Sequence, residues 1–379
     1  MQYRNLGRTG LKVSALSFGC MRLPKIPDKE NIVDQETSLK LFRRANELGI
    51  NYFDSAYLYD NGDSERVIGR FLKEAGREKI IVQTKSPVSH DWWPIPNDKP
   101  TKELWRDSLE EELKRMGTDY IDVYLFHSTF LIPFRKLVKG PKGLMDEAEK
   151  AKKQGLIHHI GISCHDTPEN IINILQMSRG AIEVIVIQYN LLDRKNESVI
   201  EYCKKKGIGV AVMGPIGGGR LISPSEIYQK VTGAKSTAEA ALRFVLSNPG
   251  VSTAMSGMNS IEQLEENTTT VSREEPLTKE EREQIDKIQK KNSELLNLYC
   301  TGCNYCMPCP NEVNIPGNFT ALNLLKVHGL PELARKTYER LDRGKTKYCK
   351  NCGQCIGKCP QHIDIPRRLK EVRETFEKL

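Results

Sequence analysis

The strongest constraint on the fold is an alternation, repeated eight times, between short apolar runs and longer amphipathic segments. Short apolar runs bounded by turn residues predict buried strands, and apolar residues three and four positions apart predict helices that cover them. Strands that alternate with helices form a parallel sheet, and eight such pairs favour a closed (β/α)8 TIM barrel over an open sheet. The predicted strands are residues 14–19, 52–56, 80–84, 120–126, 159–163, 184–188, 209–213 and 253–256.

Before the first predicted barrel strand, residues 3–13 around GRTG predict a β-hairpin. The predicted helices have recognisable ends, such as Gly117 after ELWRDSLEEELKRM and Pro249 after ALRFVLSN. No run approaches the roughly 18 apolar residues of a membrane span. The first residues also lack the basic and apolar regions of a signal peptide. We therefore expect a cytoplasmic protein that does not interact with membranes.

The eleven cysteines are concentrated toward the C-terminus, and eight of them fall between Cys300 and Cys359. An odd count, tight clustering and no export signal argue against a disulfide framework and favour thiolates that hold metal. The net charge of +8 divides in the same place, because residues 300–379 carry 14 Lys and Arg against 8 Asp and Glu. Thiolate clusters would offset this charge and aromatic residues are sparse there, so we expect no nucleic-acid partner.

The clustered cysteines form two motifs, each followed by a proline. The second has the C-x2-C-x2-C-x3-C-P spacing of bacterial ferredoxins, and the first is one residue shorter before its last cysteine. In two-cluster proteins the fourth cysteine of each motif binds the other cluster. Structural zinc sites, which also use C-x2-C pairs, are the alternative. The predicted [4Fe-4S] ligands are Cys300, Cys303, Cys306 and Cys359 for one cluster, and Cys349, Cys352, Cys355 and Cys309 for the second.

On these motifs, residues 296–370 resemble two-[4Fe-4S] ferredoxin domains. The 39 residues between Cys309 and Cys349 include a helix-like stretch at 319–341, which is similar to the α-helical ferredoxins of redox-enzyme subunits. The resemblance implies a small, mainly helical iron-sulfur domain. We expect a barrel at residues 1–275, a charged helix or linker at 276–297, and the ferredoxin-like domain at 298–379.

Polar residues follow the second, third and fourth predicted strands, where (β/α)8 barrels place their chemistry. They are Asp54 and Tyr59, then Lys85, then His127. One polar residue at a strand end is more often structural. The four together resemble the Asp, Tyr, Lys and His tetrad of the aldo-keto reductases. The resemblance spans residues 1–275 and includes LGRTGLKVS, FDSAYLY, SERVIG, DYIDVYLFH, GLIHHIGIS, IQYNLL and ALRFVLSNPGVSTAMSGMNSIEQLEEN.

This resemblance implies an NAD(P)H-dependent oxidoreductase that reduces a small aldehyde or ketone by hydride transfer. Tyr59 would be the general acid, and Lys85 would lower the pKa of its phenol. Asp54 would position the lysine, and His127 would orient the carbonyl. The hydride must come from a nicotinamide, because no side chain can supply one. No sequence motif identifies the carbonyl substrate.

The family pattern also implies where the nucleotide is bound. Cys164 stands where the family usually has an Asn, and Met213 stands where an aromatic residue commonly stacks on the nicotinamide. Gly257 and Gln263 stand where members that prefer NADPH carry Lys and Arg, so the choice between NADH and NADPH stays open. The implied contacts are Gly19, Ser163, Gln188, Met213, Gly214, Ser256, Gly257, Gln263, Glu266 and Asn267.

Two loops have both a functional and a structural interpretation. GPIGGGR at residues 214–220 either contacts the pyrophosphate of the nucleotide through backbone N–H groups or is a plain flexible loop. HDWWP at residues 90–94 either lines the substrate pocket or packs in the interior.

The leading hypothesis is a carbonyl reductase fused to a domain with two [4Fe-4S] clusters for electron transfer. The clusters serve a separate electron path, a ferredoxin-type or other redox protein, or only the structure. A nicotinamide moves electrons in pairs and each cluster takes one, so direct exchange would need an intermediary such as a flavin. The alternative is a redox-sensing or electron-transfer binding protein whose barrel binds nucleotide with little turnover.

Overall fold

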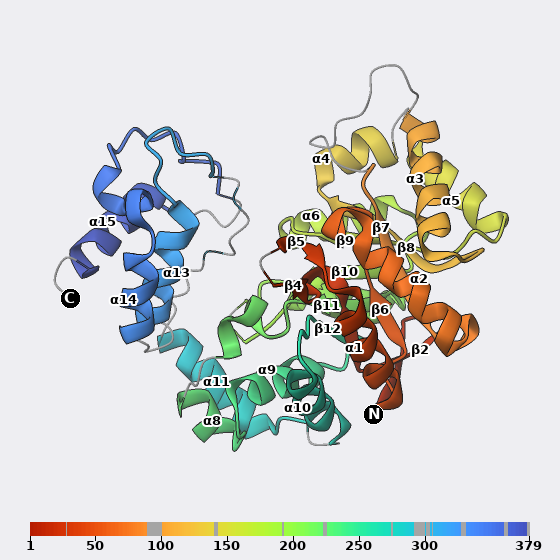
Figure 1. Ribbon diagram of the computed structural model, residues 1–379, viewed down its shortest axis with the longest axis horizontal. Helices are drawn as coiled ribbons and strands as arrows, with labels where there is room; N and C mark the ends of the chain where they lie inside the picture. The colour runs from red at the N-terminus through yellow and green to blue at the C-terminus, as the bar shows by residue number, and fades with distance from the viewer. Residues whose placement is uncertain are drawn as a thin grey trace. The chain divides into compact units, whose positions relative to one another are not determined.

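The computed structural model describes residues 1–27, 29–88, 101–139, 143–191, 193–222, 226–273, 276–291, 300, 304, 306–326, 331–359 and 363–376 (Figure 1). The chain divides into two compact units. The first comprises Met1–Ile222 and Ala238–Leu277, and the second comprises Ser223–Thr237 and Thr278–Leu379. Each unit has a hydrophobic core of its own.

The first unit is built around a closed barrel of eight parallel strands, which confirms the predicted (β/α)8 fold (Figure 1). The strands follow one another around the barrel in chain order, and the last pairs with the first to close it. All eight predicted strands are present, three of them with the predicted bounds. They are β3 (Leu16–Gly19), β6 (Tyr52–Asp54), β7 (Ile81–Ser86), β8 (Ile121–Thr129), β9 (Ile157–Cys164), β10 (Val184–Gln188), β11 (Gly209–Met213) and β12 (Thr253–Ser256).

Helices between the strands surround the barrel (Figure 1). Their ends carry the expected signals: the Asp34 carboxylate accepts a hydrogen bond from the Thr37 backbone N–H at 3.0 Å, and Gly117 has the left-handed backbone that ends a helix. The main ones are α1 (Gln35–Glu47), α2 (Asp63–Ala75), α3 (Thr101–Met116), α5 (Leu144–Lys153), α6 (Pro168–Met177), α7 (Glu197–Lys206), α9 (Thr237–Leu246) and α10 (Ile261–Ser272).

Two antiparallel hairpins accompany the barrel. The first pairs β1 (Tyr3–Asn5) with β2 (Lys12–Ser14), as predicted. The second pairs β4 (Lys25–Ile26) with β5 (Lys29–Val33) directly after the first barrel strand. This second hairpin was not predicted, because its short strands lack the alternation of apolar and polar residues that marks a half-buried strand.

The hairpin of β1 and β2 closes the end of the barrel at which the strands begin. Leu6 and Val13 are fully buried and pack with inward-facing strand residues such as Val184. Gly7 makes this possible, because a Cβ atom there would lie 2.3 Å from the backbone nitrogen of Gly209. The carboxyl ends of the strands, with the predicted catalytic residues, are at the opposite end of the barrel.

The second unit is mainly helical, as predicted, and α13, α14 and α15 pack together. Its core includes Val313, Phe319, Leu322, Leu369 and Val372. The helix-like stretch at 319–341 is divided between two helices, and residues 327–330 between them are outside the described part. The helices are α8 (Glu226–Thr232), α11 (Lys279–Lys291), α13 (Ile315–Lys326), α14 (Pro331–Glu339) and α15 (Ile365–Phe376).

Among the described residues, no helix is both long enough and apolar enough to cross a membrane.

Candidate functional site

Three of the four predicted catalytic side chains are in direct contact at the carboxyl ends of β6 and β7. The Lys85 ammonium donates hydrogen bonds to Asp54 Oδ1 at 2.7 Å and to the Tyr59 hydroxyl at 3.1 Å. It donates a third to the Ser55 carbonyl at 2.5 Å. Asp54 and Lys85 are buried, whereas Tyr59 is partly exposed. The phenol is therefore the member of this group that a bound molecule can reach.

The fourth predicted residue, His127, lies beside this group near the end of β8. The centroid of its ring is 5.9 Å from that of Tyr59, and the two rings are nearly perpendicular. Just beyond it, Ser128 has a left-handed backbone, and its N–H donates a 2.8 Å hydrogen bond to the Ser163 hydroxyl. The fold thus brings all four residues together, with Ser163 of β9 next to them.

A hydrogen-bonded chain inside the barrel supports Asp54. The Gln83 side-chain amide donates to Asp54 Oδ1 at 2.5 Å, and its carbonyl oxygen accepts from the Tyr52 hydroxyl at 2.7 Å. Gln83 and Tyr52 are fully buried. Sequence reasoning missed both, and the available signal was a polar Gln83 in the middle of an otherwise apolar strand run.

Burial and the ion pair set the protonation of the site. Burial disfavours the charged lysine, but the Asp54 carboxylate and the Tyr59 phenol outweigh it and raise the pKa of Lys85. Burial also raises the pKa of Tyr59, and the Lys85 ammonium opposes this rise without cancelling it. The lysine therefore acts in the predicted direction, but the phenol pKa lies above its ordinary value and not below it, because removal from water has the larger effect.

The turn that presents Tyr59 has an unusual backbone. Asp60 and Asn61 adopt left-handed conformations, with φ of 52° and 55°, which non-glycine residues seldom adopt. The Lys25 ammonium pairs with the Asp60 carboxylate and so connects the hairpin of β4 and β5 to this turn. Because Lys25 is remote in sequence, no local signal predicted that contact.

A second cation holds the same turn from the other side. Arg115 of α3 donates a 3.0 Å hydrogen bond to the Tyr57 carbonyl, and its guanidinium lies 4.0 Å from the centroid of the Tyr57 ring. It also donates to the buried Glu65 carboxylate at 3.0 Å. The position of Tyr59 is therefore fixed by α2 and α3 as well as by β6.

The predicted nicotinamide contacts share this end of the barrel. Ser163, Gln188 and Met213 lie at or next to the carboxyl ends of β9, β10 and β11, and Gln188 is opposite Met213 in the strand register. Gly19 and Ser256 end β3 and β12, and a Cβ atom at Gly19 would lie 3.4 Å from the Ser256 backbone.

The other predicted nucleotide contacts follow β11 and β12. Gly214 has a φ of 62°, and its carbonyl accepts a 2.9 Å hydrogen bond from the Asn190 side chain. Asn267 of α10 donates to the Ser256 hydroxyl at 3.4 Å, and the Gln263 side chain accepts from a backbone N–H at 3.1 Å. Glu266 lies between them on α10, and Gly257 directly follows β12.

Cys164, which replaces the family's Asn, is turned to the neighbouring strand. Its thiol donates to the Thr129 carbonyl at 2.8 Å and is fully buried. Burial raises the pKa of Cys164 to about 12, so the side chain remains a neutral thiol. In this orientation the Cys164 side chain does not offer the nicotinamide contact that the resemblance assigns to an Asn at this position.

A cation that sequence reasoning missed lies at the mouth of the barrel. The Arg22 guanidinium donates a 2.9 Å hydrogen bond to the Gly218 carbonyl in the GPIGGGR loop. The Arg22 side chain also lies next to Gly257. A Cβ atom added at Gly257 would lie 3.7 Å from Arg22 Cβ. Four glycines of that loop have positive φ angles. The predicted pocket segment HDWWP, residues 90–94, lies outside the described residues.

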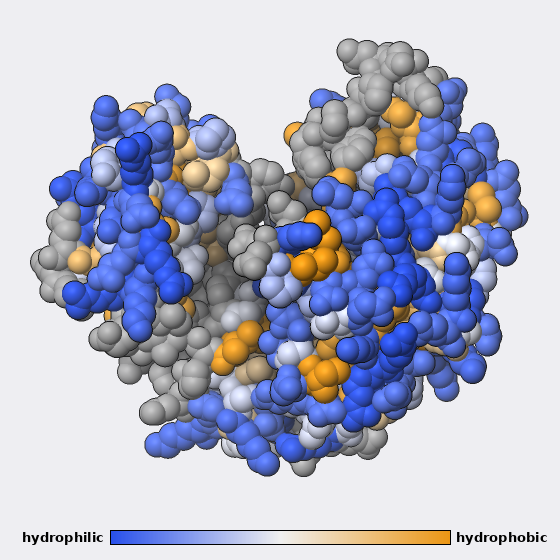
Figure 2. Space-filling model, in the orientation of Figure 1, coloured by the Kyte–Doolittle hydropathy of each residue, from blue (hydrophilic) through white to orange (hydrophobic). Residues whose placement is uncertain are grey.

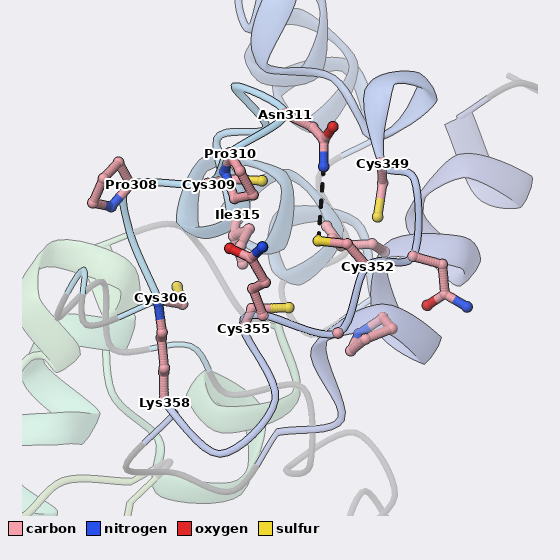
Figure 3. Close-up of a pocket in the computed structure, with 15 residues that line it drawn as sticks. Cys306, Pro308, Cys309, Pro310, Asn311, Ile315, Cys349, Cys352, Cys355 and Lys358 are labelled. Atoms are coloured by element: carbon pink, nitrogen blue, oxygen red, sulfur yellow. Dashed lines mark hydrogen bonds between the residues drawn. The ribbon is translucent and has the colours of Figure 1, made fainter.

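In the second unit, both cysteine motifs contribute to one pocket (Figure 3). Burial raises the pKa of the Cys355 thiol, and nearby Cys349, Cys309 and Cys352 raise it further. These four are the set predicted for the second cluster, and all of them line the same pocket. The cysteines lining the pocket are Cys306, Cys309, Cys349, Cys352 and Cys355.

The remaining predicted ligands belong to the other set. Cys300 and Cys359 pack against the same hydrophobic core as Cys306, and Cys303 is outside the described residues. The ten described cysteines are all free of disulfides. Within the described part of the chain, no three side chains converge on a single metal ion.

The donor set fits a [4Fe-4S] cluster, because it consists of thiols from both motifs that line one pocket, three of them partly buried and Cys352 exposed. Asn311, directly after the first motif, adds a hydrogen-bond donor to this set. Its side-chain amide lies 3.7 Å from the Cys352 sulfur and donates to it (Figure 3). Sequence reasoning missed Asn311, since the cysteine spacing carries no information about donors to sulfur.

Comparisons with known proteins agree with both units. The model of the Aldo/keto reductase family matches residues 15–290, and that of a 4Fe-4S dicluster domain matches residues 299–364. The chain is 28% identical to the uncharacterized oxidoreductase YqkF of Bacillus subtilis, over 70% of this chain and 90% of that protein. It is 29% identical to the L-galactose dehydrogenase of Arabidopsis thaliana, over 73% of this chain and 90% of that protein.

A solved structure supports the same assignment. The holo form of aldo-keto reductase AKR11C1 from Bacillus halodurans is similar with a TM-score of 0.63 and 29% identity, over 76% of this chain and 96% of that one. The family match covers most of the chain and includes all eight barrel strands and the four predicted catalytic residues. The chain therefore belongs to the aldo/keto reductase family, as an NAD(P)H-dependent oxidoreductase that carries a 4Fe-4S dicluster domain after its barrel.

Proposed function

We propose that this oxidoreductase reduces a small aldehyde or ketone by hydride transfer, with Tyr59 as the general acid. The observation that carries the proposal is the 3.1 Å hydrogen bond between Lys85 Nζ and the Tyr59 hydroxyl, backed by the buried Asp54. When bound, NAD(P)H supplies the hydride. The hydride forms a bond to the carbonyl carbon, the phenol proton moves to the carbonyl oxygen, and the products are an alcohol and oxidised nucleotide.

Each residue of the tetrad has a distinct part in that proton transfer. As Tyr59 gives up its proton, the charge that develops on its oxygen is stabilised by the adjacent Lys85 ammonium. Asp54 balances the lysine charge, and the Gln83 amide holds Asp54 in place. The partly exposed His127 orients the carbonyl. Since the pKa of Tyr59 is raised, the phenol stays in its acid form through neutral pH, and we expect reduction to slow only in the alkaline range.

The strand ends around the tetrad supply the nucleotide site. Ser163, Gln188 and Met213 would hold the nicotinamide, and α10 would contact the adenosine end. Arg22 supports this assignment, because it places a guanidinium against the glycine loop after β11. A cation there would serve the pyrophosphate, which NADH and NADPH share, and so would not select between them.

In the second unit, the cysteines would hold two [4Fe-4S] clusters for electron transfer. The second set, Cys309, Cys349, Cys352 and Cys355, is supported by their common pocket. The crossed use of Cys309 follows the rule for two-cluster ferredoxins. A ferredoxin-type or other redox protein would be the partner of these clusters.

A second candidate function rests on Cys164. Because its thiol is committed to the Thr129 carbonyl, the nicotinamide would lose one contact that the family normally provides. A barrel that binds nucleotide with little turnover, in a redox-sensing or electron-transfer binding protein, would tolerate that loss.

The test compares Tyr59→Phe with Tyr57→Phe in the anaerobically reconstituted protein, using a panel of small carbonyls. Tyr57 is the matched control, because it lies in the same turn and its hydroxyl donates to Glu111 at 2.6 Å, outside the tetrad. We expect Tyr59→Phe to lower kcat by about 10² to 10⁴, the usual contribution of a general acid. Tyr57→Phe should stay within a few-fold, and nucleotide binding should persist in both.

Turnover that survives Tyr59→Phe would contradict the reductase mechanism, and nucleotide binding with no turnover in the unaltered protein would favour the sensor. The cluster absorbance is followed in the same titration before carbonyl is added. Bleaching by NADH or NADPH alone would mean that barrel and clusters exchange electrons, and a flavin intermediary would then be sought.

A further inference from the structure

A charged groove lies beside the second cysteine motif. It is a cavity of about 560 Å3 within the second unit, and the Cys349 thiol forms part of its wall. One face of α15 forms another part, and the visible face of this unit is largely hydrophilic (Figure 2). The groove adjoins the cysteine-lined pocket, and Cys349, Asn351, Pro366 and Leu369 line both.

The α15 side of the groove is basic. Arg367, Lys370 and Arg373 are exposed and follow one another at intervals of three residues, which places them along one face of the helix. The side of the helix away from this row is buried through Val372 and Phe376, and the buried Leu369 also lines the groove. The helix is thus anchored by its apolar side and presents a row of three cations.

Among the described residues that line the groove, the cations of this row outnumber the carboxylates. The carboxylate among them is Asp364, which accepts a 3.3 Å hydrogen bond from the Arg367 backbone N–H at the start of α15. Lys370 reaches Glu374 only at 4.0 Å, on the exposed surface. In the adjoining cysteine loop, Lys350 is exposed as well. The rim of the groove therefore carries a positive field next to a predicted cluster ligand.

We propose that this groove is the docking site of an acidic one-electron carrier protein, of the ferredoxin class. The proposal rests on the proposed function, in which Cys309, Cys349, Cys352 and Cys355 hold a cluster. A row of cations attracts a surface rich in carboxylates, speeds encounter and fixes orientation. Electron transfer falls steeply with distance, so a carrier seated here, against the Cys349 wall, is well placed to exchange electrons with that cluster.

The redox step needs no bond making. The reduced carrier loses one electron and is oxidised, and the cluster gains that electron and is reduced from its 2+ to its 1+ state. No proton or leaving group is involved, and the same surface serves the reverse direction.

The test uses the full-length protein with reconstituted clusters and, as probe, a photoreduced acidic two-[4Fe-4S] ferredoxin. Stopped-flow absorbance measures the second-order rate constant for cluster reduction over a range of salt concentrations. The groove variant carries Arg367→Glu, Lys370→Glu and Arg373→Glu. The matched control carries Arg335→Glu, Lys336→Glu and Arg340→Glu, which make the same change in net charge on and directly after α14, where the side chains are also exposed.

We expect the groove variant to lose at least tenfold in rate at low salt and most of its salt dependence, while the α14 variant stays within about twofold of the unaltered protein. A milder variant, with Arg367→Gln, Lys370→Gln and Arg373→Gln, should give an intermediate loss. Reduction by photoreduced 5-deazariboflavin, a small neutral donor, should proceed equally in all of them, which shows that the clusters are intact.

Equal losses in the groove and α14 variants would overturn the proposal, because net charge alone would then explain them. An unchanged rate in the groove variant would also overturn it. The same holds if flavin mononucleotide, and not a protein, binds in the groove and carries the electrons. Iron and sulfide analysis of each protein distinguishes failure of the docking proposal from failure of the proposed function. Protein that cannot be loaded with clusters refutes both, whereas loaded protein without a groove effect refutes the docking site alone.

Discussion

Five polar side chains form one hydrogen-bonded chain from the interior of the barrel to its open end. The order is Tyr52, Gln83, Asp54, Lys85 and Tyr59. In a buried site each polar group needs a partner, and a lysine charge needs a paired carboxylate. The chain meets both needs and ends on the one phenol that a bound molecule can reach. Under the proposed mechanism, Gln83 is a positioning residue, because it acts through Asp54.

Substitution of Gln83 by Leu should lower kcat about 10-fold or more with little change in nucleotide affinity. Without the amide, Asp54 accepts one hydrogen bond fewer and holds the Lys85 ammonium less firmly, so the loss should fall on kcat and leave KM nearly unchanged. Tyr52→Phe is the comparison, because it removes only the bond to Gln83 and should cost less than Gln83→Leu. An equal loss of kcat and of nucleotide affinity in Gln83→Leu would show that Gln83 serves packing alone.

Asn311 should set the reduction potential of the cluster held by Cys352. A hydrogen bond to a ligand sulfur stabilises the more negative, reduced cluster and so raises its potential. The net value of one hydrogen bond, about 0.5–1.5 kcal/mol, corresponds to about 20–60 mV for one electron. Asn311→Ala should therefore lower the potential by that amount in an EPR-monitored redox titration. Gln354→Ala, which alters another side chain lining the same pocket, should leave it unchanged.

At this scale, sequence reasoning found residues that follow a strand or belong to a spaced motif. Asp54, Tyr59, Lys85 and His127 do come together as the family resemblance implies. Gln83 and Tyr52 were missed, because an inward-facing polar residue within a strand is indistinguishable in sequence from an outward-facing one. The net rise in the Tyr59 pKa was missed as well, because burial of the phenol depends on the whole barrel.

Among the elements, adjacent strands and helices are joined by charged side chains outside the barrel. Glu183, directly before β10, bonds His159 of β9 at 3.1 Å and pairs with Lys152 of α5. Burial alone would raise the pKa of this carboxyl, but the bonds from His159 and Lys152 outweigh burial and lower the pKa of Glu183 to about 2. One carboxylate thus ties a helix and two strands together.

This pKa predicts how the barrel's stability depends on pH. Because the folded-state pKa of Glu183 is depressed, its contribution is complete above about pH 4.5 and is lost as the pH falls toward 2. Glu183→Gln should therefore destabilise the barrel by about 1–3 kcal/mol at neutral pH. In thermal unfolding the difference from the unaltered protein should shrink steadily on acidification. Glu201→Gln, which breaks the exposed pair with Lys205 on α7, should have no measurable effect, and an equal loss there would contradict the assignment.

The sequence predicted helices and strands correctly where apolar residues recur at a regular spacing. The eight strands, the first hairpin and α3 each have a regular apolar pattern with clear end signals. The hairpin of β4 and β5 was missed because its strands are short and polar. The stretch at 319–341 was expected as helix, and its division into α13 and α14 was not, since both parts are apolar at helical spacing. The predicted domain bounds of 275 and 298 stay a prediction.

For the whole molecule, the two compact units should respond differently to loss of iron. The second unit has a small core, and its cysteines pack against that core, so metal binding and folding should be coupled there. The barrel core contains no predicted cluster ligand. Loss of iron should therefore destabilise the second unit and leave the stability of the barrel nearly unchanged.

Hydrogen exchange measured by mass spectrometry can check this expectation. After iron is removed with a chelator, exchange should quicken in α13 and α15, while β6 and β7 should remain protected and nucleotide binding should persist. Reconstitution with iron and sulfide should restore protection. Equal loosening of the barrel strands on chelation would show that the two units unfold as one.

The segment Ser223–Thr237, which contains α8, lies between β11 and α9 in the chain and yet belongs to the second unit, where α8 packs on α11. Both helices fall essentially within residues 15–290, which match the Aldo/keto reductase family, so the second unit combines the 4Fe-4S domain with two helices of the family match. A protein shortened to end at residue 277 would keep every barrel strand. It would lose α11, the helix on which α8 packs. A graft of this unit onto another reductase would therefore have to carry α8 as well as α11, from two separate places in the chain.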